Sequence, residues 1–339
     1  MAAGDESAGI QVESLGGIAG LLRRPFERIP PAVRRRIFDV DYARLDLADL
    51  GELYVTPLGW PLVESLLPDR WYTDKQYVRK GQRLRGGTGT VYKVDVPHPR
   101  LGSISLVLKF SRFAQDVPLS VSSEVLYEMP ADPFQCARFA GPFEEFGCVM
   151  ALRRAGANGP GPRVLTKRPL AIYVPLTRYA LWQTGRTDGM FESHNRIQAA
   201  DQQRYPADRQ VHLDIHRDYL LLYAWVKGAD AVIMHEQGLL DRQAMYDLTR
   251  RSIREMHARC FRMLDIKPRH LILRRRPDGS LLSRNGQLAY ALIDFELLEQ
   301  CEPCPNTTEN RGQAPSSAPI CPGPPGTHPR QKPPSTDPD

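Results

Sequence analysis

The chain has 339 residues, of which 42% are hydrophobic, enough to bury a substantial core in one or two domains. It has no run of eighteen apolar residues, and residues 1–9 lack the basic and then apolar order of a signal peptide, so we predict a cytoplasmic protein without a transmembrane segment. The net charge of +6 is modest, and no aromatic-interleaved basic stripe indicates nucleic-acid binding.

Composition divides the chain into four regions. Residues 1–70 mix prolines, arginines and short amphipathic stretches, and we predict an N-terminal extension in which a helix starts after Pro30 and Pro31. Residues 71–227 contain strand-like runs at 90–96 and 105–110 and a helical pattern at 143–155. Residues 228–299 include an amphipathic helix at 242–259 and then turn strand-like, whereas 300–339 form a proline-rich tail that we expect to be disordered.

A glycine-rich segment, LRGGTGTVYKV, begins at Leu84. Gly86, Gly87 and Gly89 lie between two strand-like runs, where the lack of a Cβ lets backbone N–H groups approach phosphate oxygens. Val91 would then lie over an adenine ring. An ordinary hairpin turn is the alternative, and it is the commoner explanation of a glycine cluster.

Lys109 lies inside an apolar strand-like run, where its charge needs a partner. The predicted helix at 143–155 supplies Glu145, which borders the apolar face because apolar residues or cysteine follow at +3, +4 and +7. Glu124 and Glu128 are nearer in sequence, but a proline follows them and makes a poorer helix. We therefore expect Lys109 to pair with Glu145; a solvent-facing edge lysine is the alternative.

Two aspartates adjoin apolar runs later in the chain. Asp265 opens the sequence DIKP, in which Lys267 follows two residues on, and Asp294 ends the run ALI. Such positions are costly for a carboxylate unless it acts as a base or a metal ligand. Phosphoryl transfer needs one carboxylate to orient the acceptor hydroxyl, a cation near the γ-phosphate and a second carboxylate for metal. The ordered set argues against a turn residue at Asp265 and a helix cap at Asp294.

These motifs resemble the protein-kinase-like superfamily, in the style of its bacterial lipopolysaccharide-kinase-like and RIO-like atypical branches. Five segments carry the resemblance: half of a glycine-rich loop at Gly86, Gly89 and Val91, a V-A-I-K-like strand at Lys109, a hinge-like segment at 219–230, a D-x-K-P loop at Asp265 and a D-F-G-like segment at Asp294. The resemblance implies a two-lobed α+β fold, with an antiparallel-sheet N-lobe and a mainly helical C-lobe.

The resemblance also implies an ATP-dependent phosphotransferase that uses Mg²⁺ or Mn²⁺ and acts on a protein or an envelope sugar. The roles that it implies are the catalytic base for Asp265, γ-phosphate binding for Lys267, nucleotide binding for Gly86, Gly87, Gly89, Val91, Lys109 and Glu145, and metal binding for Asp294 and His270. Because the proline-rich tail begins where further C-lobe helices are expected, we consider both a minimal second lobe and an abnormally ended reading frame.

Four departures from the family pattern favour alternatives to an active kinase. Leu84 replaces the first loop glycine, Met263 and Leu264 replace His-Arg, His270 replaces the metal-binding asparagine, and Glu296 replaces the glycine of D-F-G. Imidazole is a poorer magnesium ligand than an amide oxygen, so we expect one metal to be lost or Mn²⁺ to be tolerated. A catalytically impaired pseudokinase is therefore the second hypothesis. The third is a basic-surface adaptor whose arginine clusters contact membrane or nucleic acid.

Overall fold

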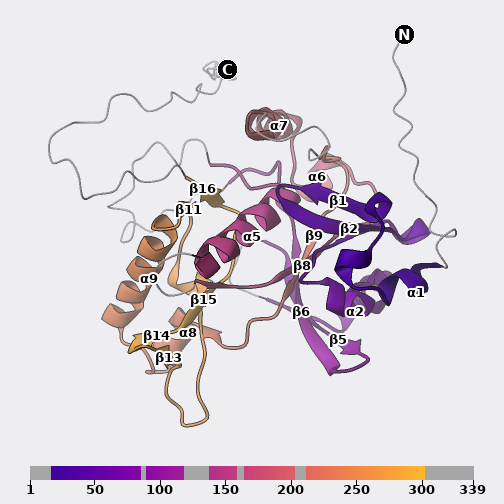
Figure 1. Ribbon diagram of the computed structural model, residues 1–339. Helices are drawn as coiled ribbons and strands as arrows, with labels where there is room; N and C mark the ends of the chain where they lie inside the picture. The colour runs from indigo at the N-terminus through magenta and orange to yellow at the C-terminus, as the bar shows by residue number, and fades with distance from the viewer. Residues whose placement is uncertain (1–16, 85–88, 118–136, 159–163, 203–210, 302–339) are drawn as a thin grey trace, which may run out of the picture. The chain divides into compact units, whose positions relative to one another are not determined.

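An eight-stranded antiparallel sheet is the largest element of the computed structural model, which describes residues 17–84, 89–117, 137–158, 164–202 and 211–301. In spatial order the strands are β1 (Arg34–Ile37), β2 (Val40–Asp46), β3 (Glu52–Val55), β8 (Pro169–Val174), β9 (Leu220–Ala224), β6 (Gly102–Phe110), β5 (Val91–His98) and β4 (Gln82–Arg83) (Figure 1). Helices combined with an antiparallel sheet confirm the predicted α+β class.

The later part of the chain adds smaller sheets. A four-stranded sheet runs in the order β10 (Ala229–Asp230), β12 (Leu271–Leu273), β15 (Tyr290–Leu292) and β7 (Leu165–Thr166), and two strand pairs are β11 (Phe261–Met263) with β16 (Leu298–Gln300) and β13 (Ser283–Arg284) with β14 (Gln287–Leu288). The described helices are α1 (Gly17–Leu22), α2 (Val63–Leu66), α3 (Gln76–Arg79), α5 (Pro142–Asn158), α6 (Leu181–Thr184), α7 (Asp188–Gln202), α8 (Ala231–Glu236) and α9 (Arg242–His257).

Local sequence patterns predicted the elements that carry the candidate site. The strand-like runs at 90–96 and 105–110 are β5 and β6, and the helical patterns at 143–155 and 242–259 are α5 and α9. Helix α9 begins where expected because the Asp241 carboxylate accepts a hydrogen bond from the backbone N–H of Ala244 at 2.7 Å.

The helix predicted after Pro30 and Pro31 was wrong. A single 3₁₀ turn (Pro31–Val33) leads directly into strand β1, which pairs antiparallel with β2. Phe38 and Asp39, both with positive φ, form the tight turn between the two strands. Strand pairing with β2 and burial of Ile37 outweigh the helix propensity of the arginine run.

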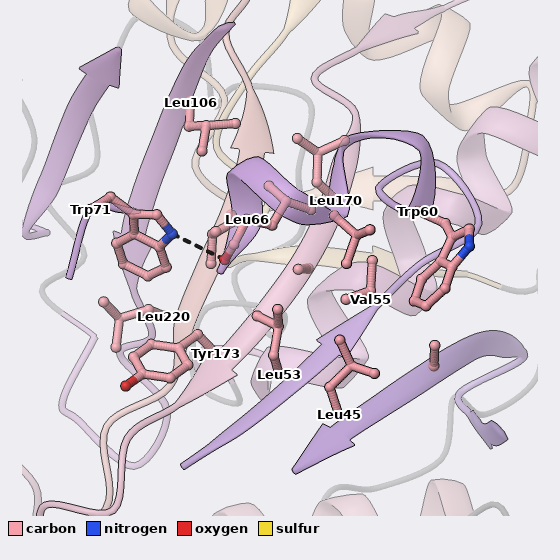
Figure 2. Close-up of a cluster of buried hydrophobic side chains, with 14 of the residues drawn as sticks. Leu45, Leu53, Val55, Trp60, Leu66, Trp71, Leu106, Leu170, Tyr173 and Leu220 are labelled. Carbon is pink, nitrogen blue, oxygen red and sulfur yellow. Dashed lines mark hydrogen bonds between the residues drawn. The ribbon is translucent and has the colours of Figure 1, made fainter. Parts of the chain in front are cut away.

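The two faces of the large sheet bury different side chains. One face forms an apolar cluster that Figure 2 shows, in which Trp71 donates its indole N–H to the carbonyl of Leu66 at 3.0 Å. In β6, Leu106 and Leu108 belong to this cluster, whereas Val107 packs on the opposite face. Because side chains alternate along a strand, Lys109 shares the face of Val107.

Helix α5 lies on that opposite face and contacts β2 and β8 (Figure 1). Phe143 and Phe146 pack against the large sheet, while Val149 and Leu152 join a separate apolar cluster with α8, α9, β12 and β15. The helix therefore has apolar partners on both sides, and Glu145 is held between them.

No helix among the described segments is long and apolar enough to cross a bilayer. Nearly all of the predicted proline-rich tail, residues 302–339, lies outside the described residues. The predicted boundaries at residues 70, 227 and 299 stay a prediction.

Candidate functional site

Lys109 is surrounded by three carboxylates. Its side chain is 4% exposed, and its Nζ lies 2.7 Å from Oδ1 of Asp294, 3.2 Å from Oε2 of Glu296 and 3.3 Å from Oε2 of Glu145. The ion pair expected between Lys109 and Glu145 is present, but Asp294 is the nearer partner. Burial by itself would lower the pKa of Lys109, and the three carboxylates reverse that effect and raise it. The lysine is therefore charged throughout the physiological range.

Glu145 is held in place by a tyrosine of the large sheet. The hydroxyl of Tyr223 in β9 donates to Oε1 of Glu145 at 2.6 Å, and both residues are almost fully buried. Burial, and next the charge of Glu145, raises the pKa of Tyr223, so the phenol stays protonated and keeps donating. Oε1 of Glu145 is thereby fixed to the sheet, and Lys109 Nζ lies near both Glu145 oxygens, 3.4 Å from Oε1 and 3.3 Å from Oε2.

Asp294 follows β15 in a left-handed backbone conformation, with φ of 64°. The strand that precedes it is anchored by the pairing of β15 with β12 and by the N–H of Ile293, which donates to the carbonyl of His270 at 3.0 Å. Burial would raise the pKa of Asp294, but the charge of Lys109 holds it well below its usual range. Asp294 is therefore ionised, with about a third of its side chain exposed.

The loop that carries Asp265 lies beside the segment of Asp294. Asp265 follows β11, which pairs with β16, and the N–H of Leu264 donates to the carbonyl of Leu297 at 3.1 Å. Lys267 Nζ lies 2.8 Å from Asp265, and each of these side chains is 37% exposed. The structure thus brings a half-exposed carboxylate and a lysine to a loop adjoining the buried ion-pair centre.

His270 belongs to the loop of Asp265 and lies near Asp294. Its Nε2 lies 3.8 Å from Oδ2 of Asp294, while its Nδ1 is buried and has no hydrogen-bonding partner among the described residues. Burial lowers the pKa of His270, and the charges of Asp294 and Asp265 oppose this only in part. The neutral imidazole is therefore favoured, which is the form that binds metals. Within the described segments, however, no group of three or more His, Cys, Asp or Glu side chains is arranged to hold a metal ion.

The glycine-rich segment connects β4 to β5, as predicted. Gly86 and Gly87 lie outside the described residues. Val91 is paired with Lys109 across the β5–β6 ladder, and the N–H of Leu84 donates to the carbonyl of Val91 at 2.9 Å. A Cβ on Gly89 would lie 3.5 Å from Cδ of Arg112, an ordinary contact distance, so packing among the described residues does not require glycine there.

The hinge-like segment requires a glycine. It covers residues 219–230, which include β9 and β10, and Gly228 has φ of 140°. A Cβ at this position would lie 2.2 Å from the carbonyl oxygen of Leu273, so a side chain is excluded. The carboxylate of Asp230 then caps α8 by accepting from the N–H groups of Val232 and Ile233.

Sequence reasoning missed two residues of this centre. Glu296, singled out only as a departure from the family pattern, forms ion pairs with Lys109 and with Arg112, the latter at 3.4 Å. Lys167, between β7 and β8, is 5% exposed and was not singled out. Its position in the largely apolar run VLTKRPLAIYV was the available signal, since the same argument identified Lys109.

The Lys167 side chain makes stability depend on pH in a defined window. Burial, followed by the charge of Lys109, lowers the pKa of Lys167 from 10.5 to about 8. Between pH 8 and 10.5 the unfolded chain holds a proton that the folded chain releases, so stability rises with pH. We expect the unfolding free energy of wild type to gain roughly 2–3 kcal/mol relative to Lys167→Met between pH 7 and 10.

Denaturant unfolding at pH 7, 8, 9 and 10 measures this difference. Lys80→Met, at an exposed lysine, serves as the control and should show the same pH dependence as wild type. Parallel curves for wild type and Lys167→Met would contradict the depressed pKa.

Comparisons with known proteins give likeness of structure only. No protein-family model matches the chain, and no curated protein matches its sequence. WaaP in complex with acyl carrier protein is similar at 12% identity, over 69% of this chain and 70% of that chain, with a TM-score of 0.32. WbdD with the kinase inhibitor LY294002 is similar at 12% identity, over 65% of this chain and 33% of that chain, with a TM-score of 0.26. Rio2 kinase with ADP/Mg²⁺ and phosphoaspartate from Chaetomium thermophilum is similar at 11% identity, over 76% of this chain and 59% of that chain, with a TM-score of 0.32. At 12% identity or less and TM-scores of 0.32 or less, this likeness assigns neither a family nor a role to this chain. This chain spans less than two thirds of WbdD and Rio2.

Proposed function

We propose that this protein is an ATP-dependent phosphotransferase that moves the γ-phosphoryl group to a hydroxyl of a protein or an envelope sugar. The observation that carries the proposal is the buried centre in which Lys109 meets Glu145 and Asp294, with the Asp265–Lys267 pair on the adjoining loop. A positioned cation, an ionised carboxylate near it and a separate half-exposed carboxylate are the set that phosphoryl transfer uses.

The proposed roles follow from the accessibility of each group. Asp265 is exposed enough to meet an acceptor and would orient its hydroxyl and accept its proton, while Lys267 beside it would stabilise charge on the transferred group. Lys109, fixed by Glu145, would contact the α- and β-phosphates. The nucleotide would lie under the glycine-rich segment formed by Gly86, Gly87 and Gly89, with Val91 against adenine.

The proposed metal is Mg²⁺ or Mn²⁺, held by Asp294 and His270. The donor set fits in part: Asp294 is ionised, and His270 is neutral with its Nε2 3.8 Å from Oδ2 of Asp294. Mg²⁺ is commonly held by one or two carboxylates together with substrate phosphates, so a cage of three protein side chains is not required. When bound, the metal would neutralise phosphate charge.

We propose that the chain is organised as two lobes. The sheet of residues 71–227 would form the first and residues 228–299 the second, with 1–70 as an extension and 300–339 as a tail. Residues 34–55 contribute three strands to the same large sheet, and 228–299 contain α8 and α9 together with short strands. The extension would thus complete the first lobe, and the second lobe would be small.

A catalytically impaired pseudokinase is the alternative, and one contact favours it. Glu296, at the position where the family has glycine, lies 3.2 Å from Lys109 and adds a negative charge beside the lysine that would meet phosphates. Burial raises the pKa of Glu296, and Lys109 only partly offsets this. A neutral Glu296 would tolerate phosphate, whereas an ionised one would oppose it.

A thermal-shift titration with ATP, alone and with Mg²⁺ or Mn²⁺, tests the proposal. ATP at 100 times its Kd should stabilise wild type by about 2.7 kcal/mol, or roughly 5 °C, when metal is present. The shift should disappear in Asp294→Asn and persist in the surface control Asp278→Asn. No shift for wild type under any condition would contradict nucleotide binding, and a shift without ATP turnover would favour the pseudokinase.

A further inference from the structure

Lys167 contacts aromatic rings where a buried lysine is expected to contact a carboxylate. Its Nζ lies 3.8 Å from the ring centroid of Tyr223 and 5.5 Å from that of Phe295. Among the described residues, no hydrogen-bond acceptor or ion-pair partner contacts its ammonium group. Its backbone N–H donates to the carbonyl of Leu292 at 3.2 Å, which ties the residue to strand β15.

Burial of such a group costs free energy that an apolar side chain of the same size would not cost. An ammonium group loses its hydration on burial, and the rings return only part of that free energy. Methionine has nearly the same length and would fill the same space without the charge. Because Tyr223 contacts Glu145 and Phe295 follows Asp294, Lys167 lies at the edge of the ion-pair centre rather than in a separate part of the core.

The two rings connect Lys167 to different parts of the ion-pair centre. Tyr223 donates its hydroxyl to Glu145, the partner of Lys109 on α5. Phe295 directly follows Asp294, which is the nearest carboxylate to Lys109. One side chain therefore contacts both the residue that fixes Glu145 and the residue that follows Asp294.

We propose that Lys167 is a positioning residue whose ammonium group, between the rings of Tyr223 and Phe295, fixes the segment 294–296 relative to Glu145. This is the site proposed to carry out phosphotransfer, so the expected effect of Lys167 on turnover rests on that proposed function. The effect on the mobility of the segment does not, because it depends on the ring contacts alone.

Charge and shape can be separated by substitution. Lys167→Met keeps the shape and removes the charge, and Lys167→Arg keeps a cation that stacks on aromatic rings. We expect Lys167→Met to lower kcat about tenfold, with the KM for ATP changed less than about twofold, and Lys167→Arg to recover most of kcat. Lys80→Met, at an exposed lysine that contacts Gln76, is the matched control and should match wild type.

Amide hydrogen exchange supplies a second readout that does not depend on turnover. Peptides covering 290–300 should exchange about tenfold faster in Lys167→Met than in wild type or Lys80→Met. Phe295→Leu removes the ring that Lys167 contacts and should give a similar increase. Combining Phe295→Leu with Lys167→Met should add little further, because both changes remove the same contact.

Five outcomes decide whether Lys167 positions the segment. Faster exchange in Lys167→Met that does not add to Phe295→Leu, together with lower kcat, supports the positioning role. Unchanged exchange overturns it, as does additivity of the two changes, and so does a Lys167→Arg protein that folds but behaves like Lys167→Met. If wild type shows no ATP turnover with either metal, the proposed function fails as catalysis, and exchange alone still decides the role of Lys167.

Discussion

Replacing Lys109 with methionine is expected to lower the free energy of unfolding by about 3–5 kcal/mol, the usual cost of removing one partner of a buried ion pair. Lys109 is the cation that Glu145, Asp294 and Glu296 share, at 3.3, 2.7 and 3.2 Å. Without it, the direct polar contact that Glu145 keeps among the described residues is the hydrogen bond from Tyr223, which offsets little of a buried negative charge. The loss should be visible in denaturant unfolding at neutral pH.

The double variant Lys109→Met/Glu145→Gln tests whether unpaired charge is the cause. Glutamine keeps an acceptor for the Tyr223 hydroxyl while removing the charge, so the double variant should be more stable than Lys109→Met by about 1–2 kcal/mol. The exposed control Lys80→Met should stay within about 0.5 kcal/mol of wild type. Equal stability of the single and double variants would show that packing, not charge, determines the loss.

Replacing Asp265 with asparagine is expected to lower ATP turnover about 10³-fold, as removal of a general base does, and to leave stability almost unchanged. The side chain is 37% exposed and forms an ion pair with Lys267, an arrangement that contributes at most about 1 kcal/mol. Initial rates of ADP release with Mg²⁺ or Mn²⁺, measured beside an unfolding curve, give both quantities.

Asp278→Asn is the matched control, because Asp278 is an exposed aspartate whose carboxylate accepts hydrogen bonds from Ser280. It should retain wild-type turnover. Turnover in Asp265→Asn within about tenfold of wild type would remove Asp265 from the role of base. Lys109→Met thus measures the stability of the buried centre, and Asp265→Asn tests the chemistry without a large loss of stability.

Local sequence alone determined several parts of this protein. Alternating apolar residues specified β5 and β6, and the 3.6-residue period specified α5 and α9, because each pattern reflects one element burying one face. The requirement that a charge in an apolar strand be neutralised led to Lys109 and selected Glu145, and both lie in contact. These predictions depend on near neighbours in the chain or on a single strong physical requirement.

Other features were decided only by the tertiary structure. Strand β1 forms because β2 is available to pair with it, although its arginine run reads as helical. The contacts of Glu296 and Lys167 depend on Lys109, Tyr223 and Phe295, which reach them from distant parts of the chain. A local pattern shows that a buried charge needs a partner, but the fold determines whether that partner is a carboxylate or an aromatic ring.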